Sequence, residues 1–239
     1  TELFQPKHTY VQSTLKHIRK NYAEGIMTYR HGEFLDQYIT ANLIEQYMVA
    51  GNSRQALVDF YHLILHAGST HEGFENMIFP WKDRLVDPRC PSPHAWAAAK
   101  TAFLIRNFML HEYGGNIENA SERDLYIYPV VSPAWTKPGE HLAMVNAPSE
   151  FGLITSRMDF TKDGATLTYS PLYNESQPRS VRLRIPYFKE LKSFKTDASK
   201  SYVEDNCIVL SPDFTTLQIQ WNEVERVHKG TFAELLKAY

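Results

Sequence analysis

The sequence predicts an α+β protein of two parts, in which α-helical hairpins are followed by an antiparallel β-sandwich. Three observations predict it. Apolar residues recur every three or four positions up to about residue 115, the pair Gly114-Gly115 interrupts that pattern, and short runs with a period of two follow. At 239 residues the chain is long enough for two domains. We therefore expect a helical segment over 1–115 and a sandwich over 116–239.

The first part is expected to contain four helices. The spacing of apolar residues predicts them over 10–23, 34–50, 53–67 and 94–113. Gly51-Asn52 is a typical helix stop and Ser53 a typical N-cap, so the second and third helices form a hairpin. The fourth helix is apolar around most of its circumference, which predicts burial on nearly every side.

The second part is expected to consist of short strands separated by turn formers such as Lys162-Asp163-Gly164. About seven short strands over roughly a hundred residues are typical of a β-sandwich. The final stretch, 231–238, predicts a short helix. The alternating runs are 125–131, 141–146, 152–161, 165–169, 180–185, 207–210 and 216–221.

Composition narrows the classes of function. The formal net charge of −2 is not that of a nucleic-acid-binding protein, and no apolar run approaches the ~20 residues that span a bilayer. Cys90 and Cys207 are too far apart for a metal or redox motif, and two free thiols are expected. There is no Gly-rich phosphate loop and no Cys/His pair at a telling spacing, and neither a cofactor nor a metal is expected. Aromatic residues make up 13% of the chain, which fits either an aromatic core or a sugar-binding cleft.

The loop between the third and fourth helices carries the richest set of chemical groups. Hydrolysis of a glycosidic bond needs one carboxyl group to protonate the leaving oxygen and a second to activate water or attack the sugar. Glu72, Glu75 and Asp83 are the candidates for these roles. Phe74 and Trp81 are candidate stacking surfaces for a sugar ring. The structural alternative is that the charged residues form ion pairs and caps within a long loop.

Further polar groups are candidates for binding the substrate. His71 and Arg84 lie in the same loop, and His94 stands at the start of the fourth helix. Arg30 and His31 precede the second helix, where an exposed loop would present them to a cleft. Glu33 and Asp36 follow them and are interpreted as stabilisers of the first helical turn. His62 and His66 have a possible metal-ligand spacing, but their apolar neighbours favour packing.

Four segments carry a family resemblance. They resemble segments from the C-terminal part of bacterial glycoside hydrolases of the six-hairpin (α/α) barrel class. The four segments are residues 68–75, 93–100, 146–152 and 182–188. The resemblance implies that the helical part belongs to an (α/α) toroid and that the substrate is an oligo- or polysaccharide. It also implies a periplasmic or extracellular location. Six hairpins need far more chain than is present. Either the chain is the C-terminal piece of a longer enzyme, with the missing N-terminal portion as an expected partner, or the helical part is a reduced version that packs on the sandwich without closing a barrel.

The leading hypothesis is thus a glycoside hydrolase, or the C-terminal portion of one. In it, Glu72 or Glu75 is the general acid, and Asp83 or the other glutamate is the base. A polysaccharide lyase is the second hypothesis, since it needs a Tyr or His base and a cation to neutralise a uronate. The candidates for the base and the cation are Tyr29, Arg30, His31 and His71. The third is a non-catalytic carbohydrate-binding module.

Overall fold

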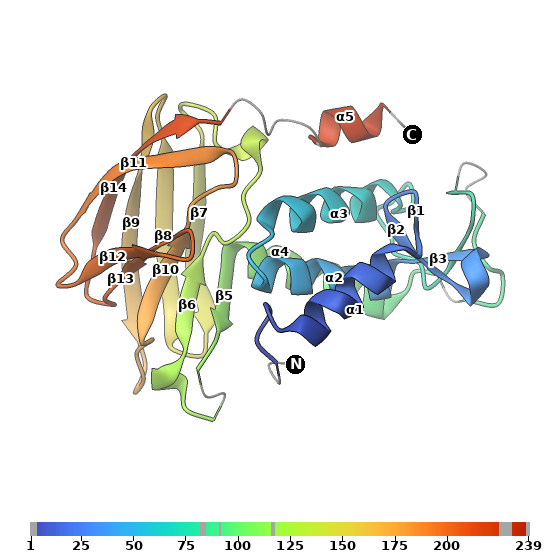
Figure 1. The fold of residues 1–239 in the computed structure, drawn as a ribbon, viewed down its shortest axis with the longest axis horizontal. Coiled ribbons are helices and arrows are strands. Elements are labelled where there is room, and N and C mark those ends of the chain that lie inside the picture. The colour runs from blue at the N-terminus through green and yellow to red at the C-terminus, as the bar shows by residue number, and fades with distance from the viewer. Residues whose placement is uncertain (1–3, 82–84, 91, 116–117, 225–230, 238–239) are drawn as a thin grey trace. The chain divides into compact units, whose positions relative to one another are not determined.

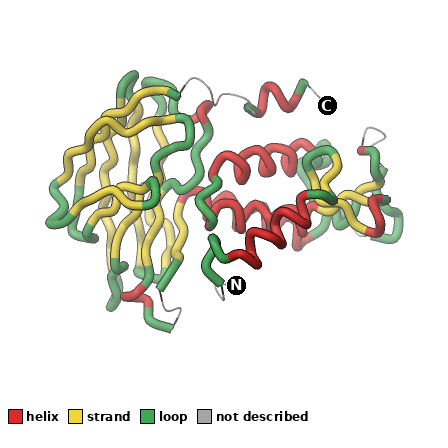
Figure 2. Tube along the Cα trace, viewed as in Figure 1, coloured by secondary structure: helices red, strands yellow, loops and turns green. Residues whose placement is uncertain are grey.

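The chain forms two compact units. The computed structural model describes residues 4–81, 85–90, 92–115, 118–224 and 231–237 (Figure 1). One unit comprises Thr1–Ile105 with Gly230–Tyr239, and the other comprises Arg106–Lys229. The described helices belong mainly to the first unit, whereas the second unit is built almost entirely of strands (Figure 2).

The predicted (α/α) toroid of helical hairpins is wrong. About 30% of the protein is helix and 35% is strand, arranged as five short helices and three sheets within the described residues. Several segments that continue a helical apolar pattern are in fact short strands. Phe34–Asp36 pairs with its neighbours in a sheet, and Leu110–Tyr113 leaves the fourth helix to pair with Asp124–Ile127. Pairing with distant strands overrides the local helical periodicity there.

The first unit combines helices with a small antiparallel sheet. This sheet has the order β1-β2-β3-β4, and each neighbouring pair runs antiparallel. Its strands are β1 Tyr22–Ala23, β2 Ile26–Tyr29, β3 Phe34–Asp36 and β4 Met77–Ile78. The helices are α1 Thr9–Arg19, α2 Gln37–Val49, α3 Ser53–Leu65, α4 Ala95–Met109 and α5 Phe232–Leu236.

Helices α2 and α3 form the expected hairpin. Gly51 has a φ of 82°, which a glycine adopts without strain, and its N–H donates to the carbonyl of Met48 at 3.0 Å. The side chain of Asn52 accepts from the N–H of Gln55 at 3.2 Å. The N-cap of α3 is therefore Asn52 rather than the predicted Ser53, which is the first helical residue.

Helix α4 is not the fully buried inner helix that the sequence predicts. Ala97, Leu104 and Phe108 form its buried face. On the rest of its surface Trp96 is 68% exposed and Phe103 is 44% exposed. The prediction is wrong because the apolar pattern shows no polar face that marks the solvent side. Five of the eleven apolar residues of α4 are alanines, which fit either a core or a solvated face, and larger apolar side chains such as Trp96 and Phe103 are exposed as well.

The second unit is a sandwich of two five-stranded sheets with the orders β12-β13-β10-β6-β5 and β11-β14-β9-β8-β7. All pairs are antiparallel except β6 with β10, which run parallel. The first sheet contains β5 Leu110–Tyr113, β6 Asp124–Ile127, β10 Ser180–Arg184, β12 Ser201–Glu204 and β13 Cys207–Leu210. The second contains β7 His141–Ser149, β8 Gly152–Phe160, β9 Gly164–Tyr173, β11 Lys189–Thr196 and β14 Thr216–Glu223.

Side chains from both sheets fill one core. Leu125 and Ile208 from the first sheet belong to the same buried cluster as Ile154 and Leu217 from the second. The hydroxyl of Tyr128 lies 2.8 Å from the hydroxyl of Ser156, and the hydroxyl of Tyr169 lies 2.8 Å from that of Tyr173, so both tyrosines of this cluster have a hydrogen-bond partner. The alternation of buried and exposed residues along β8 and β14 explains why the sequence indicates these strands.

Candidate functional site

The long loop after α3 is tied to the start of α2. Gln37 is buried, and its amide donates to the carbonyl of His66 at 3.1 Å and accepts from the N–H of Phe74 at 2.7 Å. Farther along, the N–H of His94 donates to the carbonyl of Gly73 at 2.9 Å. A Cβ atom on Gly73 would lie 2.8 Å from the Cβ of Ala97, so only glycine lets the loop approach α4 so closely. These contacts bring Glu75 and His94 to the N-terminal ends of α2 and α4.

Asp36, Glu75 and His94 form a charged group at this place. Asp36 is only 9% exposed and caps α2 by accepting from the N–H of Ile39 at 2.7 Å. Burial raises the pKa of Asp36 above its usual value, and the charge of Glu75 adds to this rise. Hydrogen bonds from the backbone and the charge of His94 act against the rise in this pKa without cancelling it. Asp36 is therefore a carboxyl group that holds its proton more tightly than an ordinary one.

Aromatic rings stand next to this group. The Trp96 side chain is 68% exposed, and its ring centroid lies 5.8 Å from that of Tyr38 and 5.9 Å from that of His94. An exposed tryptophan beside carboxyl groups is a suitable stacking surface for a sugar ring. Nδ1 of His94 is buried and has no hydrogen-bond partner among the described residues.

Phe74 and Trp81 do not offer the stacking surfaces that the sequence predicts. They are 7% and 4% exposed, and their ring centroids lie 5.6 Å apart. The ring of Trp81 also stacks on the buried ring of His66 at 6.3 Å, and the backbone N–H of Trp81 donates to the carboxylate of Glu24 at 3.3 Å. The two aromatic residues are core side chains of the first unit. The aromatic face next to the carboxyl groups is that of Trp96.

Glu72 has a structural partner within its own turn. Its carboxylate accepts from both the N–H and the hydroxyl of Thr70, and its carbonyl accepts from the N–H of Gly68 at 3.0 Å. The Thr70 hydroxyl, as the main cause, lowers the pKa of Glu72. A group with a lowered pKa gives up its proton early, which is the wrong tendency for a general acid. Glu75 is the candidate from this loop that lies next to a second carboxyl group.

The remaining predicted site residues lie apart from this group or outside the described chain. Arg30 and His31 are exposed in the turn between β2 and β3, and the guanidinium of Arg30 lies 5.7 Å from the ring centroid of Tyr29. His71 is exposed in the Thr70–Glu72 turn. Asp83 and Arg84 fall outside the described residues.

The two histidines with metal-like spacing have other surroundings. Burial lowers the pKa of His62 to about 4, and the charge of His66 contributes to this shift. His66 is fully buried, and its Nδ1 lies 2.7 Å from the carbonyl of His62. In the part of the chain that the structure describes, no three His, Cys, Asp or Glu side chains are grouped to hold a metal ion. Cys90 and Cys207 are free thiols.

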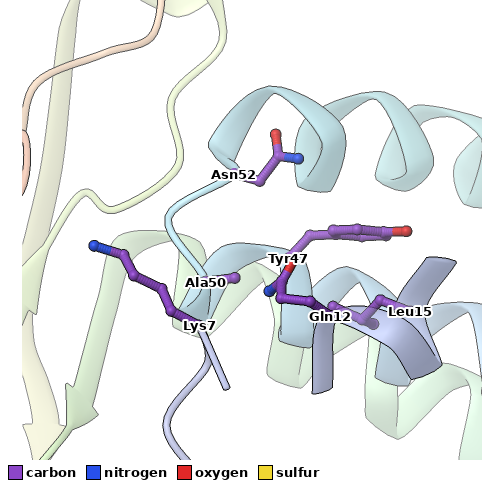
Figure 3. A pocket seen from close by; sticks show the side chains of 6 residues that line it. All are labelled: Lys7, Gln12, Leu15, Tyr47, Ala50 and Asn52. Carbon is purple, nitrogen blue, oxygen red and sulfur yellow. The ribbon is translucent and has the colours of Figure 1, made fainter. Parts of the chain in front are cut away.

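A separate small pocket of about 230 Å³ lies between α1, α2 and the turn into α3. The ring of Tyr47 lies between Asn52, at the start of α3, and the α1 side chains Gln12 and Leu15 (Figure 3). Lys7 and Ala50 complete its lining. The pocket has no carboxyl group in its lining and therefore does not offer the paired acids of the group around Asp36.

Comparison with known proteins gives no match to a family model or to a curated sequence. Among the helices in the described ranges, none has the length and apolar character needed to cross a membrane. The fold and the site define a two-unit protein. Its first unit contains helices and a pair of interacting carboxyl groups, and its second unit is a β-sandwich. Its function must be inferred from the chemistry of the site.

Sequence reasoning missed part of the site. The sequence marks Asp36 as a stabiliser of the first helical turn, and Asp36 does cap α2, but its position next to Glu75 is not predicted. Trp96 is predicted to lie on a buried helix and is exposed. A usable signal was present for Asp36, because a carboxyl group that directly follows the apolar pair Phe34-Leu35 is a candidate for burial. The pairing of Asp36 with Glu75 has no sequence signal, since 38 intervening residues must fold to create it.

Proposed function

We propose that the first unit cleaves glycosidic bonds, with Asp36 as the proton donor and Glu75 as the second carboxylate. The observation that carries this proposal is that the two carboxyl groups interact at a place where burial, helped by the charge of Glu75, raises the pKa of Asp36. An acid whose pKa is raised and a carboxylate beside it are the two groups that glycoside hydrolysis requires. The proposal keeps Glu75 from the sequence-based candidates and replaces Glu72 with Asp36.

The surroundings of the pair support a sugar as the substrate. Trp96 provides an exposed aromatic face for one side of a pyranose ring, and the ring of His94 lies beside it with the two ring centroids 5.9 Å apart. Glu75 and His94 also lie in two of the segments that resemble six-hairpin glycoside hydrolases. The proposal takes only the chemistry from that resemblance. The periplasmic or extracellular location and the N-terminal partner portion stay predictions.

A survey of substrates tests this function. The purified chain is incubated with neutral and acidic oligo- and polysaccharides, and both new reducing ends and ultraviolet absorbance are measured. We expect new reducing ends without an unsaturated, absorbing product, because a hydrolase adds water across the bond. A product that absorbs would instead indicate the lyase, with a base outside the Asp36 group. No cleavage of any substrate would contradict the proposal.

Matched variants locate the activity. Asp36→Asn and Glu75→Gln should each lower kcat by roughly 10²- to 10⁴-fold, the usual contribution of a general acid or base. Asn caps a helix about as well as Asp, so the first variant should still fold. Glu72→Gln, in the same loop but paired with Thr70, should keep most of the activity. An equal loss in all three variants would contradict the assignment.

A non-catalytic carbohydrate-binding module is the second candidate, and the exposure of Trp96 favours it. Binding needs only the aromatic face and nearby polar groups, whereas the raised pKa of Asp36 matters for catalysis alone. Glycan binding that Trp96→Ala abolishes, without cleavage by the unmodified chain, would support the module and exclude the hydrolase.

A further inference from the structure

The second unit has a basic pocket of its own, on the outer face of the sheet that contains β10, β12 and β13. Its volume is about 440 Å³, which lies within the range of small-molecule sites, roughly 300–1,000 Å³. The lining comprises Arg179, Ser180, Arg182, Lys200, Tyr202, Glu204, Val209, Leu210 and Ser211. This pocket is independent of the Asp36 group.

Strand register explains how the pocket forms. Arg182 and Tyr202 are both register partners of Val209, so the three residues form one row across β10, β13 and β12. Neighbouring residues on these strands, such as Leu183 and Ile208, belong to the core, so the row faces the other side of the sheet. Val209 is 1% exposed and forms the floor. The edge strand β12 carries Tyr202, which is 40% exposed, as one wall.

A buried carboxylate fixes the arginines of the pocket. Asp124 is 3% exposed and accepts from Nε and Nη2 of Arg179 at 2.9 and 2.8 Å. Its Oδ2 also lies 2.8 Å from Nε of Arg182. The side chain of Arg179 nevertheless stays 53% exposed, so one edge of a guanidinium group held in place by Asp124 remains open to solvent. Such fixed donors lose little entropy when a ligand binds.

The charges define the kind of ligand. Arg179, Arg182 and Lys200 are cationic, and Glu204 and the underlying Asp124 are anionic, which leaves one positive charge in excess. A single carboxylate matches that excess, and the planar fork of a guanidinium group suits it. Glu204, whose side chain is 50% exposed, can accept from sugar hydroxyls, and the ring of Tyr202 offers a face for stacking. Glu204 also pairs with Nη1 of Arg182 at 3.0 Å, and a fatty acid has no hydroxyl to donate to the remaining acceptor positions of Glu204.

We propose that this pocket binds a carboxylate-bearing sugar residue, a hexuronate, with Arg179 holding the carboxylate and Tyr202 stacking on the ring. The second unit is then a binding unit for acidic saccharides. This site does not need the first unit to be a glycosidase, and a failure of either proposal leaves the other intact.

Calorimetric titration of the full chain tests the proposal with three probes, namely a short oligomer of galacturonate, its carboxyl-reduced galactose counterpart and a sulfated galactose oligomer. We expect only the galacturonate oligomer to bind. Arg179→Gln should weaken its binding by about tenfold or more, because a hydrogen bond to a charged group is lost. Asp124 keeps Arg182 and Ser180 as partners in this variant, so the sheet should remain folded.

Arg157→Gln is the matched control, since Arg157 is paired with Asp159 through the same atoms but lies outside the pocket. It should change the affinity by less than twofold. Equal binding of the reduced or sulfated oligomer would overturn the assignment to a carboxylate. The site itself would be overturned if the galacturonate oligomer did not bind, or if Arg179→Gln and Arg157→Gln bound it equally well. It would also be overturned if Trp96→Ala lost binding while Arg179→Gln retained it.

Discussion

The buried carboxyl group of Asp36 lies within electrostatic reach of the Glu75 carboxylate, so burial and, to a smaller degree, the charge of Glu75 raise the pKa of Asp36. The two residues are far apart in the sequence and are brought together because Gln37 ties the loop backbone at Phe74 to the first turn of α2. A carboxyl group with a raised pKa next to a second carboxyl group is the arrangement on which the proposed chemistry depends.

Glu75→Gln should lower the pKa of Asp36. The substitution removes a negative charge that favours the protonated form, while the burial of Asp36 remains. Carbon-13 NMR of the labelled Asp36 carboxyl group, followed through a pH titration, measures the change without any substrate. Glu72→Gln is the control and should leave this titration unaltered. A pKa of Asp36 that is the same in the unmodified chain and in Glu75→Gln would show that the two groups do not interact.

Trp96→Ala should raise KM or the dissociation constant of the saccharide identified in the survey by about tenfold. An exposed aromatic face contributes through stacking, and aromatic contacts are worth roughly 0.5–1.5 kcal/mol beyond their area. Stability should change little because the side chain is 68% exposed. Phe103→Ala removes another exposed aromatic residue from the same helix and should leave binding unchanged. Equal effects of the two variants would exclude Trp96 as the stacking surface.

His111 should make the second unit less stable in acid. Burial lowers the pKa of His111 from 6.5 to about 4, so between these values the unfolded chain binds a proton that the folded chain does not. The free energy of unfolding therefore increases with pH across this window, and about 2 kcal/mol is lost on going from pH 7 to pH 5. His111→Gln should reduce this loss in urea titrations at the two pH values. The exposed residue His141, changed to Gln, serves as control and should retain the full pH dependence.

The sequence indicates local structure better than long-range packing. Gly51-Asn52 marks the hairpin turn because a glycine with positive φ and a capping side chain are local requirements. The alternation along Gly152–Phe160 marks a strand because each side chain reports the face on which it lies. The apolar residues of Leu110–Tyr113 continue the pattern of α4 and predict a helix, and only the pairing with Asp124–Ile127 reveals a strand.

The candidate site was indicated only in part for the same reason. Glu75 and His94 stand out in the sequence because polar residues in a long loop are candidates for function. The burial of Phe74 and Trp81 depends on packing around His66, and the exposure of Trp96 depends on which face of α4 meets the rest of its unit. None of these relationships follows from spacing along the chain.

The most direct test of the central claim compares leaving groups in Asp36→Asn. A proton donor matters for a poor leaving group such as a sugar or alkyl alcohol, whereas a dinitrophenolate departs without a proton. The measurement is kcat for matched alkyl and dinitrophenyl glycosides of the sugar found in the survey. We predict that Asp36→Asn loses at least a hundredfold on the alkyl glycoside and less than tenfold on the dinitrophenyl glycoside. An equal loss on both substrates, or no loss on either, would contradict the role of Asp36 as the proton donor.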